Sequence, residues 1–139
     1  TKAFGGPFID IAGRAGLLET FAVIRRCALF LSSDTGLAKA AMAFGIPTVT
    51  VWGPSDRSGW GTIWDLDRHL EVFRSMSCSP CVRMGLRNEG AGVINFANCG
   101  HRACLKELSP QEVSGAILRR YQGLLAGEPP AKAGEFPAR

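Results

Sequence analysis

Short apolar runs alternate with an Ala-rich segment between residues 28 and 53, and this alternation constrains the fold more than any other feature of the chain. The first apolar run leads into a polar turn at 34–36, and the second follows the Ala-rich stretch. We expect three elements here: a strand at 29–32, a helix at 36–44 and a strand at 48–52. Strands joined through a helix lie parallel in one sheet, so the pattern predicts an α/β fold with a parallel sheet covered by helices.

Further elements extend this pattern in both directions. The hydrophobic spacing predicts a short strand at 8–11, a helix at 16–27, a strand at 70–73 and a C-terminal helix. The C-terminal helix is expected to begin at Ser109 as the N-cap, with Pro110 at its first position and Glu112 at its third.

Size and composition fit one soluble globular domain. The chain has 139 residues, of which 46% are hydrophobic and 20% are charged. We expect a single domain over 1–126 and a disordered tail, rich in Pro, Gly and Ala, over 127–139. No apolar stretch approaches the roughly 20 residues that a membrane span needs. The net charge of +4 suits an anionic ligand but is too small to indicate a nucleic-acid partner.

The polar turn at 34–36 has the residue types of an anion-binding helix start. Asp34 or Thr35 can cap the helix, and Gly36 lets a ligand approach the backbone closely. Lys39 lies one turn into the helix and could reach a phosphate as a point charge. Unpaired N–H groups and the helix dipole favour a phosphate at such a helix start. The alternative is an ordinary capped helix with no ligand.

Several blocks in their order along the chain resemble the heptosyltransferase family of glycosyltransferases, the ADP-heptose:lipopolysaccharide enzymes and their relatives. The resemblance covers roughly residues 8–120. Its blocks are Asp10–Leu17, the Asp-Thr-Gly turn, the Ala-rich helix, Gly45–Asp56, Cys78–Cys81, Cys99, Cys104–Leu105 and Leu108–Val113.

The resemblance implies the GT-B architecture, in which two Rossmann-like domains face each other across a cleft. This chain looks like the C-terminal, donor-binding domain, lacking the N-terminal domain and the first strands of its own sheet. The family's Asp-Thr-Gly turn contacts the donor diphosphate. That role carries to Asp34, Thr35 and Gly36, with Leu37 following by position and Lys39 standing where the family usually has His.

The same resemblance implies an inverting sugar transfer that requires no metal cofactor. The donor would be a nucleotide diphosphate sugar, with an ADP-heptose-like sugar favoured, and the acceptor a lipopolysaccharide-type glycolipid. No residue of this chain is assigned as catalytic, because the base belongs to the N-terminal domain. We therefore expect the isolated chain to transfer no sugar and its open sheet edge to favour self-association. The implied location is cytoplasmic, with the inner face of the membrane as a peripheral site.

Four of the five cysteines lie between residues 75 and 104. Cys78 and Cys81 form a Cys-x2-Cys pair, and Cys99 and Cys104 form a looser Cys-x4-Cys pair. Four such thiols can make a tetrahedral zinc site, with the single histidine of this region, at 101, as a spare ligand. The alternatives are reduced thiols packed under a long loop and a disulfide. In each metal or disulfide case we expect the four sulfurs to lie close together.

A second functional interpretation follows from the same cysteines. A zinc-ribbon-like knuckle on an α/β core could be a non-enzymatic module that binds a protein or a nucleic acid. Arg83, Arg87 and Arg102 lie near the cysteines in the sequence and could supply its basic face. Binding of a nucleoside diphosphate without binding of random DNA would separate the enzyme from this module.

Overall fold

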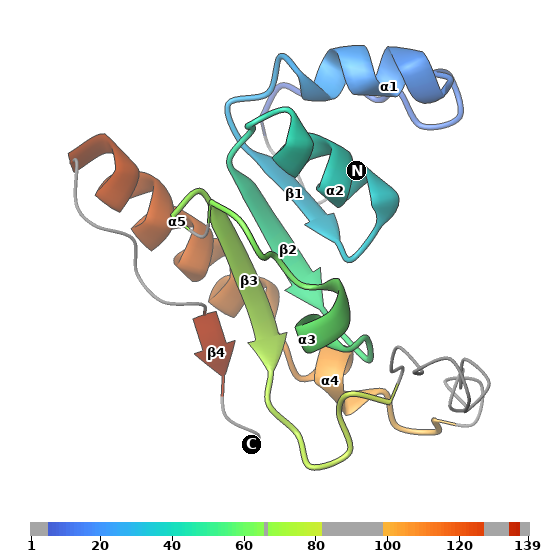
Figure 1. Ribbon diagram of the computed structural model, residues 1–139, viewed down its shortest axis with the longest axis vertical. Coiled ribbons are helices and arrows are strands. Elements are labelled where there is room, and N and C mark those ends of the chain that lie inside the picture. The colour runs from blue at the N-terminus through green and yellow to red at the C-terminus, as the bar shows by residue number, and fades with distance from the viewer. Residues whose placement is uncertain (1–5, 66, 82–98, 127–133, 137–139) are drawn as a thin grey trace.

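The computed structural model describes residues 6–65, 67–81, 99–126 and 134–136. Along the chain the elements alternate between helices and strands, as the sequence pattern predicts (Figure 1). They are α1 (Leu17–Ile24), β1 (Phe30–Ser33), α2 (Gly36–Ala43), β2 (Thr48–Trp52), α3 (Arg57–Trp60), β3 (His69–Arg74), α4 (Ala103–Lys106), α5 (Pro110–Ala126) and β4 (Gly134–Phe136).

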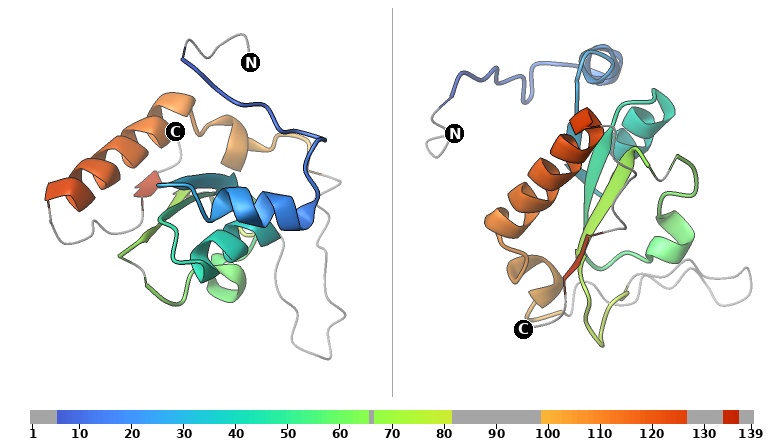
Figure 2. Two further views of the ribbon diagram at one scale, coloured as in Figure 1. Left: turned by 90° about the horizontal axis from the view of Figure 1, so that it is seen from above. Right: turned by 90° about the vertical axis from the view of Figure 1, so that its left-hand side faces the viewer.

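The strands form one parallel sheet in the order β1-β2-β3-β4. Phe30 pairs with Thr48 at the start of the sheet, and Trp52 pairs with Phe73 at its other end. The arrowheads of β1, β2 and β3 point the same way in Figure 1, so their carboxyl ends share one edge of the sheet. In the two side views the sheet lies between α5 on one face and α2 with α3 on the other (Figure 2).

The face under α5 holds the hydrophobic core. Val49 of β2, Leu70 and Val72 of β3, and Leu108 and Ala116 are buried there against one another. The other face of β2 presents Thr48, Thr50 and Trp52 toward α2, whose Ala38, Ala41 and Met42 are also buried. This alternation follows from the period of two along a strand. The small side chains of α2 let the helix pack close to the sheet, which positions its first turn at the carboxyl edge.

Most predicted elements are confirmed with small shifts of their ends, including the strand expected at 70–73. The expected strand at 8–11 is wrong, because these residues belong to no strand of the sheet. Phe8 and Ile9 are 54% and 89% exposed, so their apolar side chains are not buried by a sheet. The segment instead ends in a turn, in which the Arg14 N–H donates to the Ile11 carbonyl over 3.0 Å.

The expected disordered tail differs from the structure at one place. Gly134–Phe136 forms β4, which pairs parallel with the end of β3. The other residues of the segment 127–139 lie outside the described part of the chain. Within the described ranges, no helix is both long enough and apolar enough to cross a membrane.

Candidate functional site

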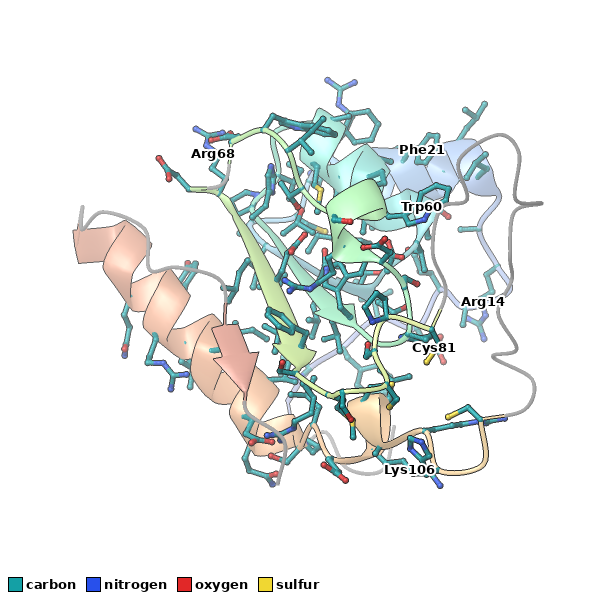
Figure 3. The ribbon with its side chains drawn as sticks, turned by 60° about the horizontal axis from the view of Figure 1, so that its bottom comes forward. Arg14, Phe21, Trp60, Arg68, Cys81 and Lys106 are labelled. Carbon is teal, nitrogen blue, oxygen red and sulfur yellow. The ribbon has the colours of Figure 1, made fainter. Side chains whose placement is uncertain are left out.

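The carboxyl edge of the sheet brings the ends of β1, β2 and β3 together. In parallel α/β sheets ligands bind outside this edge, where loops and helix starts converge. Three features meet here: the turn between β1 and α2, a pocket between the ends of β2 and β3, and the segments that carry the four clustered cysteines. Figure 3 shows Trp60 and Cys81 on one side of the molecule and Arg68, which precedes β3, at the opposite end.

Thr35 is the N-cap of α2. Its backbone is extended, with φ −149° and ψ 164°, and its hydroxyl accepts a hydrogen bond from the Ala38 N–H over 3.5 Å. The Ser32 and Thr35 hydroxyls are 3.1 Å apart, which fixes the Thr35 side chain at the end of β1. Of the two predicted capping residues, the structure therefore selects Thr35. Asp34 lies beside the cap, half-buried, and its carboxylate makes no hydrogen bond or ion pair with another described residue.

The first turn of α2 presents free backbone donors to open space. The N–H groups of Gly36 and Leu37 have no acceptor among the residues that the structure describes. Gly36 is exposed, and a Cβ added to it would meet nothing within 4 Å. Two adjacent unpaired donors at a helix start, together with the helix dipole, form an anion-binding arrangement. The absence of a side chain at Gly36 leaves that backbone accessible to a ligand.

The Lys39 side chain is directed toward α3 rather than toward the exposed N–H groups of this turn. Its ammonium group donates to the Trp60 carbonyl at the end of α3, and it lies 5.1 Å from the centre of the Trp52 ring. The lysine therefore links α2, α3 and the end of β2. Its charge remains close to the helix start, but its donors are directed to α3.

A pocket of about 210 Å³ opens between the ends of β2 and β3. The residues around it are polar hydroxyl residues, two aromatic residues and residues of the loops that follow the strands: Trp52, Gly53, Ser55, Asp56, Arg57, Ser58, Phe73, Arg74, Ser75, Met76, Ser79 and Pro80. The Trp52 indole N–H is buried and has no hydrogen-bond partner among the described residues. Trp52 also carries the Lys39 contact on its ring, so it connects the pocket with the turn before α2.

The charged side chains at the pocket are engaged within the protein. Arg57 lies 3.3 Å from the centre of the Phe73 ring and forms an ion pair with Glu71 over 3.3 Å. Asp56 is the N-cap of α3 and accepts a hydrogen bond from the Ser58 N–H over 2.9 Å. The pocket therefore offers hydroxyl groups to a ligand rather than a free charge.

Arg74 fastens the end of β3 to the start of α5. Its side chain is 2% exposed, and it donates to Glu112 over 2.8 Å and to the Glu107 carbonyl. Glu112 also accepts hydrogen bonds from the N–H and hydroxyl of Ser109, the reciprocal pattern of a capping box. The Ser109 N–H, the Arg74 guanidinium and the Ser109 hydroxyl lower the pKa of Glu112 to about 2. The predicted cap at Ser109 and Glu112 is confirmed.

All five cysteines are free thiols, and the four clustered ones influence one another. Burial raises the pKa of Cys81, and the neighbouring Cys78 and Cys99 raise it further. Burial also raises the pKa of Cys104, followed in size by the effects of Cys81, Cys99 and Cys78. These thiols therefore influence one another electrostatically, and the expected close approach of all four sulfurs stays a prediction. In the described part of the chain, however, no group of three or more His, Cys, Asp or Glu side chains is arranged to hold a metal ion.

The comparison with protein families shows which family the chain belongs to. The family model of glycosyltransferase family 9 (heptosyltransferase) matches residues 2–91, about two thirds of the chain. The chain belongs to this family. No curated protein and no solved structure matches it. The match contains α2 and the pocket, whereas Cys99, Cys104 and α5 lie beyond it. Family membership favours a glycosyltransferase over the non-enzymatic binding module.

The sequence located the turn at this sheet edge but only part of its surroundings. Asp34, Thr35, Gly36 and Leu37 lie together at the start of α2, as expected. One wall of the pocket, with Gly53, Ser55 and Asp56, lies in the Gly45–Asp56 block of the family resemblance, and its other wall at 73–80 was missed. These residues directly follow the strand expected at 70–73, so their position at the same sheet edge was the available signal. Arg83 and Arg87, which would complete a basic face, lie outside the described residues.

Proposed function

We propose that this chain is the donor-binding part of an inverting glycosyltransferase, and that the turn before α2 binds the diphosphate of a nucleotide sugar. The observation that carries the proposal is the pair of unpaired N–H groups at Gly36 and Leu37, in open space at the carboxyl edge of the sheet. Phosphate oxygens are the acceptors that such a helix start favours. Glycosyltransferase family membership supplies the class of ligand.

In this proposal the turn stabilises the leaving group of the reaction. Negative charge develops on the nucleoside diphosphate as the bond to the sugar breaks. Preorganised backbone donors and the dipole of α2 stabilise that charge, and Lys39 adds a positive charge nearby. Asp34, beside the cap and without a partner among the described residues, is placed to accept hydrogen bonds from sugar hydroxyls. Thr35 holds the turn in position rather than binding the ligand directly.

The other participants of the reaction are proposed from the family. The donor is an ADP-linked, heptose-like sugar, and the acceptor is a lipopolysaccharide-type glycolipid. A facing N-terminal domain supplies the base that activates the acceptor hydroxyl, so the sugar transfers with inversion. The proposed location is the cytoplasm, with access to glycolipid at the inner membrane face. No residue described here is assigned as catalytic.

Titration of the chain with ADP, UDP and AMP tests the proposal. We expect a nucleoside diphosphate to bind more tightly than AMP, because the second phosphate reaches the free N–H groups. Gly36→Ala should weaken ADP binding by about tenfold or more, because the added methyl group stands where the phosphate would approach the N–H groups, and loss of one charge-assisted hydrogen bond is worth about 1.5–3 kcal/mol. The same substitution should raise stability by about 0.4–1 kcal/mol, because alanine restricts the unfolded chain more than glycine does.

Gly115→Ala is the matched control, because it changes a glycine to alanine in α5 on the opposite face of the sheet. Its added Cβ would meet only the flexible end of Arg119, at 3.3 Å. This variant should bind ADP as the unchanged chain does. Equal affinity of the unchanged chain and Gly36→Ala for ADP would contradict the assignment of the turn.

A further inference from the structure

The surface formed by α2 and the segment after α3 carries a group of exposed apolar side chains. Trp60, Ile63 and Trp64 are 48%, 81% and 45% exposed, and Phe44, the C-cap of α2, is 38% exposed. We call these four side chains the aromatic face. Single exposed apolar side chains are ordinary on a protein surface, whereas a group of them marks a surface that contacts another molecule.

Contacts between the two elements place these side chains on one surface. The Thr62 hydroxyl donates to the Met42 sulfur over 3.7 Å, and the Arg68 guanidinium donates to the Gly45 carbonyl over 3.2 Å. The segment 62–68 therefore runs beside the end of α2. This surface lies on the side of the sheet opposite α5 (Figure 2).

Hydrogen bonds fix the backbone of this segment while its apolar side chains stay exposed. The Lys39 ammonium group donates to the Trp60 carbonyl, and the Thr62 N–H donates to Glu71 over 2.8 Å. Glu71 in turn pairs with Arg57, at the start of α3, over 3.3 Å. Because the backbone is already held at both places, little further ordering is needed when the exposed side chains bind a partner.

Two cations border the aromatic face and have no acidic partner among the described residues. The Arg25 guanidinium lies 5.7 Å from the centre of the Phe44 ring. The Lys39 ammonium group lies against the Trp60 carbonyl. The surface therefore combines apolar rings with positive charge at their border.

Acidic side chains offset this charge only in part. Of the two acids in the segment 61–68, Asp65 forms an ion pair with Arg68 over 3.4 Å, and Asp67 is exposed. Among the described residues of this surface, two cations without an acidic partner therefore stand against one exposed acid. The remaining positive charge suits an anionic partner.

We propose that the aromatic face rests on an anionic lipid bilayer. Trp60, Ile63 and Trp64 enter the interfacial layer, and Arg25 and Lys39 lie against the lipid headgroups. Tryptophan suits the boundary between headgroups and acyl chains, because its ring is apolar and its N–H is polar. Apolar burial and attraction of cations to anionic lipid together hold a chain at such a surface. Under the proposed function, on which only this consequence rests, the bound chain meets its glycolipid acceptor in the same bilayer.

Tryptophan fluorescence of the 139-residue chain with lipid vesicles tests the proposal. The chain has three tryptophans, and Trp52 is buried, so a change in emission reports Trp60 and Trp64. With vesicles of phosphatidylcholine and phosphatidylglycerol in equal amounts, the emission should shift to shorter wavelength. Brominated phosphatidylcholine in these vesicles should quench it. Absence of both the shift and the quenching would overturn the proposal.

Three variants locate the contact on the chain. Ile63→Ser should weaken vesicle binding by about fivefold or more, because a large apolar side chain leaves the interface. Arg25→Gln should weaken binding to the mixed vesicles by about fivefold, through the lost headgroup attraction. Leu118→Ser is the matched control, because Leu118 is an exposed apolar residue of α5, on the opposite side of the sheet. It should bind as the unchanged chain does, and equal affinity of all three variants would overturn the proposal.

Two further measurements separate this proposal from the alternatives. Ile63→Ser should bind ADP as the unchanged chain does, so failure of the lipid contact is distinguishable from failure of the diphosphate site. Gel filtration over a range of protein concentrations tests whether the aromatic face pairs with a second copy. Dimers that Ile63→Ser abolishes, in a chain that does not bind vesicles, would assign the face to a second copy and overturn the lipid proposal.

Discussion

The turn before α2 and the cysteine turns beside α4 lie at the same edge of the sheet, but they are built differently. The first is continuous in sequence: β1 ends, Thr35 caps the helix, and Gly36 exposes the backbone within four residues. The second joins segments that come from either side of residues 82–98 and meet at Gly53 and Pro54. Local hydrogen bonds complete the first region, whereas the described thiols of the second are not arranged into a ligand group.

The two regions differ in how their polar groups are held in place. A helix start preorganises its donors through backbone geometry alone, so the turn before α2 is ready to bind an anion. The cysteine turns lie on two separate segments, so no single backbone element holds them in one arrangement. Substitutions can disturb the turn before α2, the helix α3 beside it and the link between β3 and α5 separately.

The largest effect is expected from Gly61→Ala, at the end of α3. An added Cβ would lie 2.2 Å from the Arg57 carbonyl oxygen, so the last turn of α3 must move. We expect a loss of about 3 kcal/mol in the free energy of unfolding, measured with urea, as for severe overpacking. The Trp60 carbonyl that accepts from Lys39 should shift with α3.

Gly100→Ala is the control for this prediction, because its Cβ would meet nothing within 4 Å. It should leave stability within about 0.5 kcal/mol, as surface substitutions usually do. If Gly61→Ala were equally mild, the described packing of α3 over the turn would be wrong.

A smaller, pH-dependent effect is expected from Glu112→Gln, which removes the partner of Arg74. The folded-state pKa of Glu112, about 2, is below its ordinary value of 4.5. Its stabilising contribution is therefore present above pH 4.5 and is lost as the pH falls toward 2. We expect Glu112→Gln to be less stable than the unchanged chain at pH 7, and the difference to shrink between pH 4.5 and 2. A difference that stays constant over that range would exclude the ion pair as its cause.

Removal of the cap should have a more local effect. Thr35→Ala deletes the hydroxyl that accepts from the Ala38 N–H and should lower stability by about 1 kcal/mol. Thr35→Ser keeps the hydroxyl and should retain most of that stability. Thermal unfolding of the two variants measures the effect. Equal loss in both would show that the methyl group of Thr35, rather than the cap, carries the contribution.

The smallest effect is expected from Lys39→Met. Its ammonium group contacts the Trp52 ring and the Trp60 carbonyl, an arrangement worth about 0.5–1 kcal/mol of stability. Because these contacts direct the ammonium to α3, ADP binding should weaken less than in Gly36→Ala. Calorimetric titration of the two variants compares them. A larger loss of affinity in Lys39→Met would place the diphosphate beside α3 rather than at the helix start.

The sequence predicted the fold best where the hydrophobic periodicity agrees with residues that are typical of helix ends. Gly45 and the apolar run after it define the end of α2 and the start of β2, and Ser109 with Glu112 defines the start of α5. The expected strand at 8–11 was wrong because an apolar run does not reveal whether a neighbouring strand is available to pair with it. β4 was missed because three residues in a Pro- and Gly-rich tail carry no strand signal of their own.

The site was predictable to the extent that it is local. The Asp-Thr-Gly turn could be identified from its residues and its family resemblance, but the engagement of Lys39 by Trp60 depends on the position of α3. The far wall of the pocket depends on the register between β2 and β3, which sets Trp52 opposite Phe73. The spacing of the cysteines predicted two cysteine-bearing turns, whereas the support of both segments at Gly53 and Pro54 depends on the end of β2 and could not be predicted.

An amide-resolved NMR titration of the chain with ADP tests the central claim most directly. If the turn before α2 binds the diphosphate, the largest changes in backbone N–H resonances should occur at Gly36, Leu37 and Ala38, and those of Cys99–Cys104 should change little. Gly36→Ala should abolish or greatly weaken the response. The claim would be contradicted if ADP produced its largest changes at the cysteine turns or in α5, or no changes at the start of α2.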